Sequence, residues 1–229
     1  MKQKRECQRC GTCCRKGGPA LHKEDRELIE NGTISLSHLV TVRQGEPAFN
    51  PFKEQVEPAR HEFIKIGGKK GSWECLFFDG VKSACTIHQN RPLECRLLEC
   101  WDTDAVGEIT GRDCLCRFDI MPDNVHMKDF IVRHEETCSM SRVCSLLDEL
   151  LADETQQEIH ERLTGIMQKD LQIRSSAVAR FHLSLEEELF YFGRPLFHAL
   201  HHPRLHIDFK GGTIRLSILP DATKGSCSR

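Results

Sequence analysis

Eight cysteines occur at two places in the sequence, with spacings that suit metal ligation. Four lie within the first fourteen residues and four surround an Arg-Pro pair: Cys7, Cys10, Cys13, Cys14, Cys75, Cys85, Cys95 and Cys100. Thiolates separated by two residues in a tight loop converge on one soft cation or cluster. Cys7, Cys10 and Cys13 are therefore predicted to share a metal and to need a fourth, distant ligand. Cys14 follows Cys13 directly, so we expect its side chain to point toward a second metal or an unoccupied flank.

The donor types and their spacing favour an iron–sulfur cluster over zinc. In a Cys-x2-Cys-x2-Cys loop, one segment supplies ligands to three corners of a [4Fe–4S] cubane. The fourth ligand comes from elsewhere in the chain. Zinc, the alternative, usually takes pairs of short knuckles, whereas Cys75, Cys85 and Cys95 are separated by nine residues each. Four basic residues flank the cysteines and can offset the negative charge of a thiolate-ligated centre. They are Arg15, Lys16, Arg91 and Arg96.

The other five cysteines are interpreted as ordinary thiols. They are Cys114, Cys116, Cys138, Cys144 and Cys227. Cys114 and Cys116 are close enough to serve a second cluster, but Asp113-Cys114-Leu115-Cys116 also reads as a strand with alternating faces. His134 and Cys138 share a helical face at i, i+4, and this spacing alone does not make them a ligand pair.

A histidine-rich stretch near the C-terminus offers a second candidate metal site. His198, His201 and His202 stand at i, i+3 and i+4 on a predicted helix, and His206 follows Pro203. This spacing is compatible with zinc. We interpret the stretch instead as a helix end whose exposed imidazoles are favoured by the helix dipole.

Composition limits the class of protein and the cellular compartment with which the sequence is compatible. The chain has 13 cysteines in 229 residues and a net charge of −2, so it lacks the basic surplus typical of nucleic-acid binding. We expect no membrane span, because no run approaches 18 apolar residues. The odd cysteine count and the charged residues 1–6, with no apolar segment behind them, argue against a secreted disulfide protein. We therefore expect a cytoplasmic protein with reduced thiols.

The distribution of cysteines divides the chain into two predicted parts of an α+β fold. Twelve cysteines lie at or before Cys144, so we expect a small cysteine-rich, metal-bound domain with short strands and helices over residues 1–122. Residues 123–229 are predicted to form a mainly helical accessory region that ends in a β-hairpin and packs on the first domain. We find no internal repeat.

Several elements are predicted in the first part. Residues 23–30 form a short helix that ends at Asn31-Gly32, residues 38–43 form a strand, and residues 47–58, with three prolines, form a loop. Two β-prone runs, 63–66 and 73–78, are joined by a glycine-rich turn and predict a hairpin. After a turn at Asp79-Gly80, the run 84–87 places Cys85 on a strand beside Cys75. Pro92 begins a short helix that carries Cys95.

The second part changes to helical periodicity. Leucines at 146, 147, 150 and 151 form one apolar stripe, and a second stripe runs from Ile159 to Leu171. Ser184 and Glu187 form a capping box for a further helix. Residues 204–209 and 213–218, separated by Gly211-Gly212, are predicted to close the chain as a hairpin.

The cysteine segments resemble the CxxCxxCC family, also called the YkgJ family of zinc- or iron-chelating cysteine-cluster proteins. The resemblance rests on Cys7-Gln-Arg-Cys10-Gly11-Thr-Cys13-Cys14, on Cys75-Leu-Phe-Phe-Asp79 and on Cys85-Thr-Ile-His88-Gln-Asn-Arg91-Pro92-Leu-Glu-Cys95-Arg96, and it covers about residues 7–100. His88 stands where the family has a tyrosine. The resemblance implies metal chelation without implying a reaction. Its flagellin lysine-methylase members indicate that the module can accompany an enzyme, but this chain has no recognisable methyl-donor site.

Two functions remain open on the sequence. In the first, the protein binds an iron–sulfur cluster or another metal and transfers electrons, senses redox state or carries metal to an unknown protein or redox partner. In the second, it is a cluster-dependent enzyme or enzyme subunit whose helical half forms the pocket; a structural zinc protein is the further alternative. The sequence has no Gly-rich phosphate loop, nucleophile elbow or His-Glu-x-x-His motif, which favours the first function.

Overall fold

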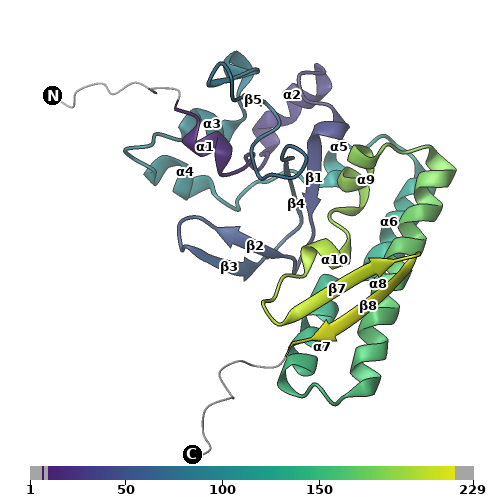
Figure 1. The fold of residues 1–229 in the computed structure, drawn as a ribbon. Coiled ribbons are helices and arrows are strands. Elements are labelled where there is room, and N and C mark those ends of the chain that lie inside the picture. The colour runs from purple at the N-terminus through teal and green to yellow at the C-terminus, as the bar shows by residue number, and fades with distance from the viewer. Residues whose placement is uncertain (1–6, 8–9, 220–229) are drawn as a thin grey trace, which may run out of the picture. The chain divides into compact units, whose positions relative to one another are not determined.

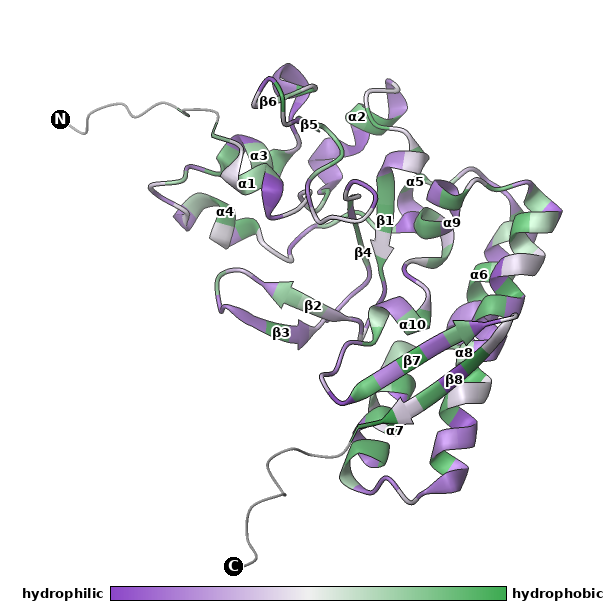
Figure 2. Cartoon of the chain, viewed as in Figure 1, coloured by the Kyte–Doolittle hydropathy of each residue, from purple (hydrophilic) through white to green (hydrophobic). Residues whose placement is uncertain are grey.

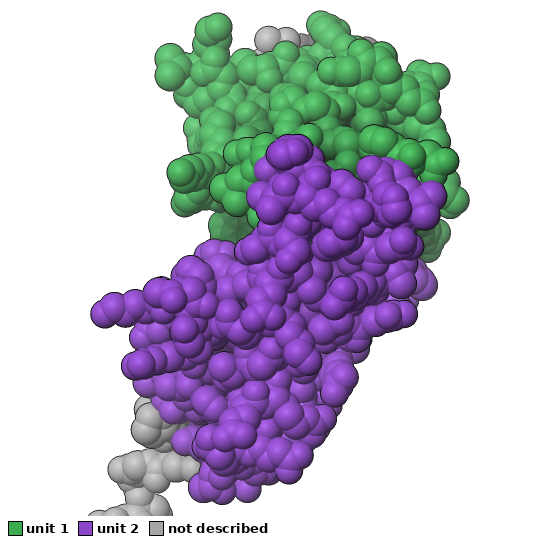
Figure 3. Space-filling view, turned by 90° about the vertical axis from the view of Figure 1, so that its right-hand side faces the viewer, with its two compact units in different colours: residues 1–42, 62–123, 184–193 green, residues 43–61, 124–183, 194–229 purple. Residues whose placement is uncertain are grey.

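The computed structural model describes residues 7 and 10–219, and these residues form two compact units. Each unit is assembled from separate stretches of the chain, as Figure 3 shows by colour. Unit 1 comprises residues up to 42, 62–123 and 184–193, and unit 2 comprises residues 43–61, 124–183 and the chain from 194 onward. The fold is α+β, as predicted (Figure 1).

Unit 1 is built on a two-stranded antiparallel sheet of β1 (Leu39–Val42) and β4 (Phe63–Ile66). Its short helices are α1 (Thr12–Arg15), α2 (Arg26–Glu30), α3 (Leu93–Leu97), α4 (Asp104–Ile109) and α5 (Arg117–Ile120). A second strand pair is β5 (Phe78–Asp79) with β6 (Ala84–Cys85), and single 3₁₀ turns are η1 (Lys23–Asp25), η2 (Leu36–His38) and η3 (His88–Asn90). Leu21, Ile34 and Ile64 are fully buried and belong to the core of unit 1.

A late helix completes unit 1. Helix α9 (Leu185–Phe192) begins at Ser184, whose hydroxyl accepts a hydrogen bond from the Glu187 N–H in the predicted capping box. The Thr41 hydroxyl of β1 donates to the Phe190 carbonyl at 2.5 Å, and the Arg117 guanidinium donates to the Tyr191 carbonyl at 2.5 Å. Since Phe190 is buried as well, unit 1 needs residues from the far end of the chain to close its core.

Unit 2 has an apolar helical core. Its helices are α6 (Val125–Thr137), α7 (Met140–Ala152), α8 (Gln157–Phe181) and α10 (Leu196–Ala199), and its hairpins are β2 (Pro47–Asn50) with β3 (Gln55–Pro58) and β7 (Leu205–Lys210) with β8 (Thr213–Ile218). Figure 2 shows hydrophobic residues recurring along α7 and α8. Leu146, Leu163 and Leu216 meet in one buried cluster, so both predicted helical stripes and the C-terminal hairpin are confirmed.

Two sequence expectations about strands are wrong. Strand β4 pairs with β1 rather than with residues 73–78; of these, Cys75 makes an isolated bridge with Gly68, and Phe78 belongs to β5. Residues 47–58 form a hairpin, not a loop. Its first and last prolines face each other at the open end of a two-stranded pair, where the missing N–H groups break no inner ladder.

Most other predicted elements are present, but the predicted helix carrying His198, His201 and His202 is wrong, because α10 ends at Ala199. The predicted helix over residues 23–30 forms as η1 followed by α2, and the predicted strand at 38–43 forms as β1. Cys85 lies on β6 as expected, whereas Cys75 lies three residues before β5. Helix α3 carries Cys95, with Pro92 as its N-cap. Among the described residues, no helix combines the length and apolar character needed to cross a bilayer.

Candidate metal centre

Helix α1 presents two consecutive predicted ligands. Cys13 and Cys14 lie on this single turn, and their Sγ atoms are 4.0 Å apart. The turn begins at Gly11 with φ of 75°, a left-handed conformation in which a Cβ atom would lie 2.2 Å from the Phe78 ring. A glycine is therefore required at this position, and α1 is held directly against the strand that leads toward Cys85.

Backbone hydrogen bonds bring Cys75 and Cys85 to the same place. The Cys75 N–H donates to the Cys14 carbonyl at 2.8 Å, and the Phe78 N–H donates to the Cys75 carbonyl at 3.0 Å. Phe78 pairs with Cys85 across the β5–β6 hairpin. The chain thus positions Cys14, Cys75 and Cys85 through local turns and one short ladder.

Cys95 on α3 joins these three thiols electrostatically. Burial and the nearby Cys75, Cys14, Cys13 and Cys85 thiols raise the pKa of Cys95 well above its usual range. Burial, followed by the charges of Cys13, Cys75 and Cys85, raises the pKa of Cys14 to about 12. We call Cys14, Cys75, Cys85 and Cys95 the inner thiol set. The Cys14 and Cys95 thiols therefore hold their protons in the absence of a cation, and metal binding must displace them.

Cys100 lies near the N-terminal cysteines. Burial and then the charges of Cys13, Cys7 and Cys10 raise the pKa of the Cys100 thiol. The side chain of Thr12, 3.2 Å from the Cys10 Sγ, lowers the pKa of the Cys10 thiol. We call Cys7, Cys10, Cys13 and Cys100 the outer thiol set; all four are exposed. The distant partner expected for the N-terminal loop therefore has a candidate, Cys100.

Among the described residues, no three thiols of either set come as close together as the sulfurs of a zinc tetrahedron. Four sulfurs at Zn–S distances of 2.3 Å lie about 3.8 Å from one another. Among the described residues, three or more candidate ligand atoms come within 4.8 Å of one another only in the group His134, Cys138 and Asp170. A cubane holds its thiolates farther apart, because they are attached to the outer corners of a metal–sulfur cube.

The group around Asp170 is a hydrogen-bonded network in unit 2. His134 and Cys138 are at the end of α6, and both are fully buried with Asp170 of α8. One oxygen of Asp170 lies 2.6 Å from His134 Nε2 and accepts from Arg174 Nε at 2.7 Å; the other accepts from the Leu196 N–H at 2.9 Å. Burial raises the pKa of Asp170, but the hydrogen bond with His134 and the charge of Arg174 outweigh it and hold that pKa below its usual range. With its acceptors engaged by a guanidinium, this carboxylate is poorly suited to a cation.

The remaining cysteines are dispersed. The Cys114 thiol donates to the Arg112 carbonyl at 3.6 Å, the backbone of Cys116 caps α5, and the Cys144 thiol is 4.0 Å from the Gly45 carbonyl. Cys227 lies outside the described residues. All twelve cysteines within the described part of the chain are free thiols.

The histidine-rich stretch shows no metal-site geometry. His198, His201 and His206 are exposed, and Nδ1 of His202 accepts a hydrogen bond from the Arg204 N–H. No three of these imidazoles come together as candidate ligands among the described residues.

The predicted charge-offsetting residues have different surroundings. Arg15 lies 3.9 Å from Glu74 and covers the Phe78 ring, and Arg96 donates to Glu24 at 2.6 Å. Lys16 is exposed. Arg91, on the segment between Cys85 and Cys95, keeps a buried Nε without a hydrogen-bond partner among the described atoms. A donor of this kind suits an anionic thiolate centre.

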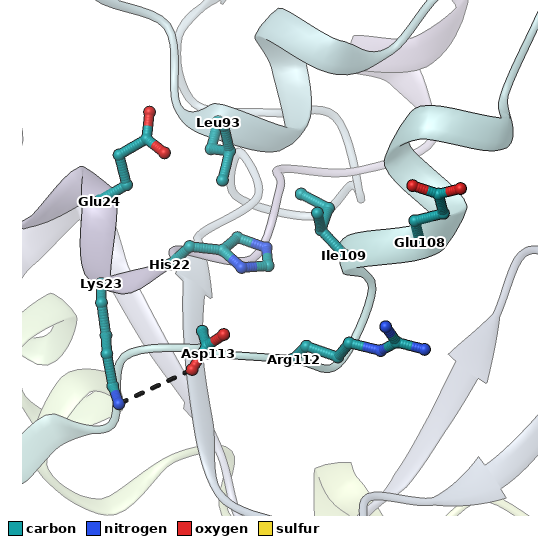
Figure 4. A pocket seen from close by; sticks show the side chains of 8 residues that line it. All are labelled: His22, Lys23, Glu24, Leu93, Glu108, Ile109, Arg112 and Asp113. Carbon is teal, nitrogen blue, oxygen red and sulfur yellow. Dashed lines mark ion pairs between the residues drawn. The ribbon is translucent and has the colours of Figure 1, made fainter.

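A cavity of about 390 Å³ lies beside α3 (Figure 4). His22, Leu93 and Ile109 line its inner part, and charged side chains such as Arg112 surround its opening. An ion pair between Lys23 and Asp113, 3.8 Å apart, lies along one side.

Comparison with known proteins agrees with the cysteine pattern. The family model of the CxxCxxCC zinc- or iron-chelating domain matches residues 6–145, more than half of the chain. The matched region includes both thiol sets and extends through Cys138 and Cys144. No curated protein and no solved structure was found to match the chain.

Proposed function

Because the chain belongs to the CxxCxxCC family of zinc- or iron-chelating domains, we propose that this metal-binding protein carries iron–sulfur clusters. Its role is electron transfer, redox sensing or metal delivery, with a redox protein or metal acceptor as its partner. The twelve free thiols of the described chain suit a reducing compartment such as the cytoplasm.

The observation that carries this proposal is the outer thiol set. Cys7, Cys10 and Cys13 have the single-loop spacing of a [4Fe–4S] ligand run, and Cys100 is a fourth thiol within their electrostatic range. The exposed loop around Cys10 and Cys13 can close around a preformed cluster. The four thiolates would then be the cluster's complete ligand set.

The inner thiol set supplies a second centre. The Sγ atoms of Cys14 and Cys13 are 4.0 Å apart, but the Cys14 carbonyl also accepts the Cys75 N–H, which joins Cys14 to the inner set. The buried Arg91 Nε, on the segment between Cys85 and Cys95, is a donor of the kind that suits anionic sulfur. All eight predicted ligands are thereby assigned, four to each centre.

A cluster-dependent enzyme is the second candidate function. The cavity beside α3 favours it, since Leu93 in its wall lies two residues from Cys95. A small ligand in this cavity would be bound next to the inner thiol set. A change in the cluster spectrum on adding small carboxylates or amines would support this function.

Anaerobic purification followed by iron, acid-labile sulfide and zinc analysis tests the proposal. We expect iron and sulfide in nearly equal amounts, with more iron than one [4Fe–4S] cluster can hold. Zinc without sulfide would overturn the iron–sulfur assignment and make the protein a zinc protein. Iron and sulfide sufficient for one cluster only would refute the assignment of two centres.

A further inference from the structure

Helix α3, which carries Cys95, has little to hold it in place by itself. It is five residues long, far below the length at which an isolated helix is stable in water. None of its residues is buried, and its N-cap residue, Pro92, supplies no side-chain cap. Local propensity and apolar packing therefore do not fix the position of Cys95.

A distant carboxylate caps α3 instead. Asp25, which is only 1% exposed, accepts the Leu93 N–H on Oδ1 at 2.8 Å. Its other oxygen accepts the His22 N–H at 2.9 Å. An acidic side chain at a helix N-terminus binds the free N–H groups and stabilises the helix dipole. Asp25 thus joins the first turn of α3 to the segment 20–25.

A second carboxylate makes the same connection from the opposite direction. Glu94, the residue before Cys95, accepts the Ala20 N–H on Oε2 at 2.9 Å and lies 3.4 Å from His22 Nε2 through Oε1. The Asp25 carboxylate thus reaches from the segment 20–25 to α3, and the Glu94 carboxylate reaches from α3 to that segment.

The segment 20–25 is itself part of the rigid core of unit 1. The Leu21 N–H donates to the Ile64 carbonyl of β4 at 2.9 Å, and the Leu115 N–H donates to the Leu21 carbonyl at 2.8 Å. Leu21 is fully buried. A side chain anchored to this segment is therefore anchored to the sheet.

We propose that Asp25 and Glu94 are positioning residues that hold Cys95 in place for metal binding. The inference rests on the proposed ligand role of Cys95 in the inner thiol set. Without the two carboxylates, the metal would have to order α3 as it binds, and that loss of conformational freedom would weaken binding. Outer-shell partners of metal ligands typically change affinity by 10- to 100-fold.

Anaerobic Co²⁺ titration of the metal-free full chain measures this effect, because cobalt thiolates absorb in the visible and near-ultraviolet. Wild type should bind Co²⁺ at both thiol sets. Asp25→Asn and Glu94→Gln should each weaken binding at the inner set by about tenfold and leave the outer set unchanged. Glu99→Gln is the matched control, since among the described residues the Glu99 side chain accepts only from the Trp101 indole, at 3.0 Å, and the change should leave both sets unchanged.

A double-mutant cycle separates positioning from general damage to the fold. In a Cys95→Ser background, Glu94→Gln should cause no further loss of Co²⁺ affinity, because it acts through Cys95. Additive loss in that background, or unchanged inner-set affinity in both single variants, would overturn the proposal. If Asp25→Asn does not fold, Glu94→Gln decides the question. Wild type that binds no Co²⁺ through thiolates would instead count against the metal sites themselves.

Discussion

The thiol-bearing segments of unit 1 and the helices of unit 2 are held in place by different forces. Helices α7 and α8 bury continuous apolar stripes that close over one cluster with β8. Helices α1 and α3, which present three of the predicted ligands, bury no residue at all. The comparison indicates that unit 2 is stabilised by its own packing, whereas α3 is held by the carboxylates of Asp25 and Glu94, and we expect a bound metal to hold the thiol-bearing segments further.

Removing α9 should have the largest effect on the stability of unit 1. A fragment of residues 1–122 lacks the helix that packs on β1, so its core stays open and it should aggregate even when metal is supplied. Size-exclusion chromatography and circular dichroism check this outcome. Phe190→Ala in the full chain is the milder version and should lower the free energy of unfolding by about 3–5 kcal/mol. A soluble, folded, metal-loaded fragment would show that α9 is dispensable.

Single cysteine replacements should show that the two thiol sets bind metal separately. Cys10→Ser should remove the metal of the outer set and Cys85→Ser that of the inner set, so each variant should keep about half of the wild-type metal. Cys116→Ser, which belongs to neither set, is the control and should keep all of it. Metal analysis after anaerobic purification measures the loss. Full metal retention in both test variants would contradict the assignment of these ligands.

Breaking the network of unit 2 should destabilise the chain without changing its metal content. Asp170→Asn removes the buried carboxylate to which Arg174 Nε donates, and we expect a loss of about 3–5 kcal/mol of stability. Asp148→Asn, on the exposed face of α7, should cost less than about 0.5 kcal/mol. Chemical denaturation gives both values. Loss of metal in Asp170→Asn would indicate that the unit 2 network contributes to a metal site.

A smaller effect on the stability of the chain should appear at acidic pH. The pKa of Asp170 is held below its ordinary value of 3.8, so this carboxylate contributes stability that is complete above that value and is lost as the pH falls below it. The free energy of unfolding of unit 2 should therefore fall below about pH 4, and Asp170→Asn should flatten that fall. An identical acid profile in wild type and variant would exclude Asp170 as the source.

Elements determined by local sequence were predicted well. The apolar stripes of α7 and α8, the capping box of α9 and the glycine turn between β7 and β8 are set by residues within a few positions of one another. The pairing of β1 with β4 was missed because a complete hairpin, β2–β3, is inserted between the two strands. Pattern rules for hairpins assume that adjacent β-prone runs pair, and they carry no information about such insertions.

The candidate site was predicted only in part for a similar reason. Spacing alone led to the prediction of eight cysteine ligands and a distant partner, and this stays a prediction. Spacing left open where Cys14 points and which thiol joins the N-terminal loop. Asp170 was missed because a carboxylate on a long helix gives no sequence signal of burial, although its i, i+4 spacing to Arg174 offered one. Asp25 was likewise missed as a cap, since α3 lies far from it in sequence.

Hydrogen exchange of the metal-loaded and metal-stripped full chain tests the central contrast most directly. The account predicts that stripping the metal under anaerobic conditions accelerates amide exchange in residues 10–16 and 75–100 by at least about tenfold, while α7 and α8 exchange at the same rates in both states. Equal protection of residues 10–16 and 75–100 with and without metal would contradict it, because the thiol segments would then be held by the protein alone.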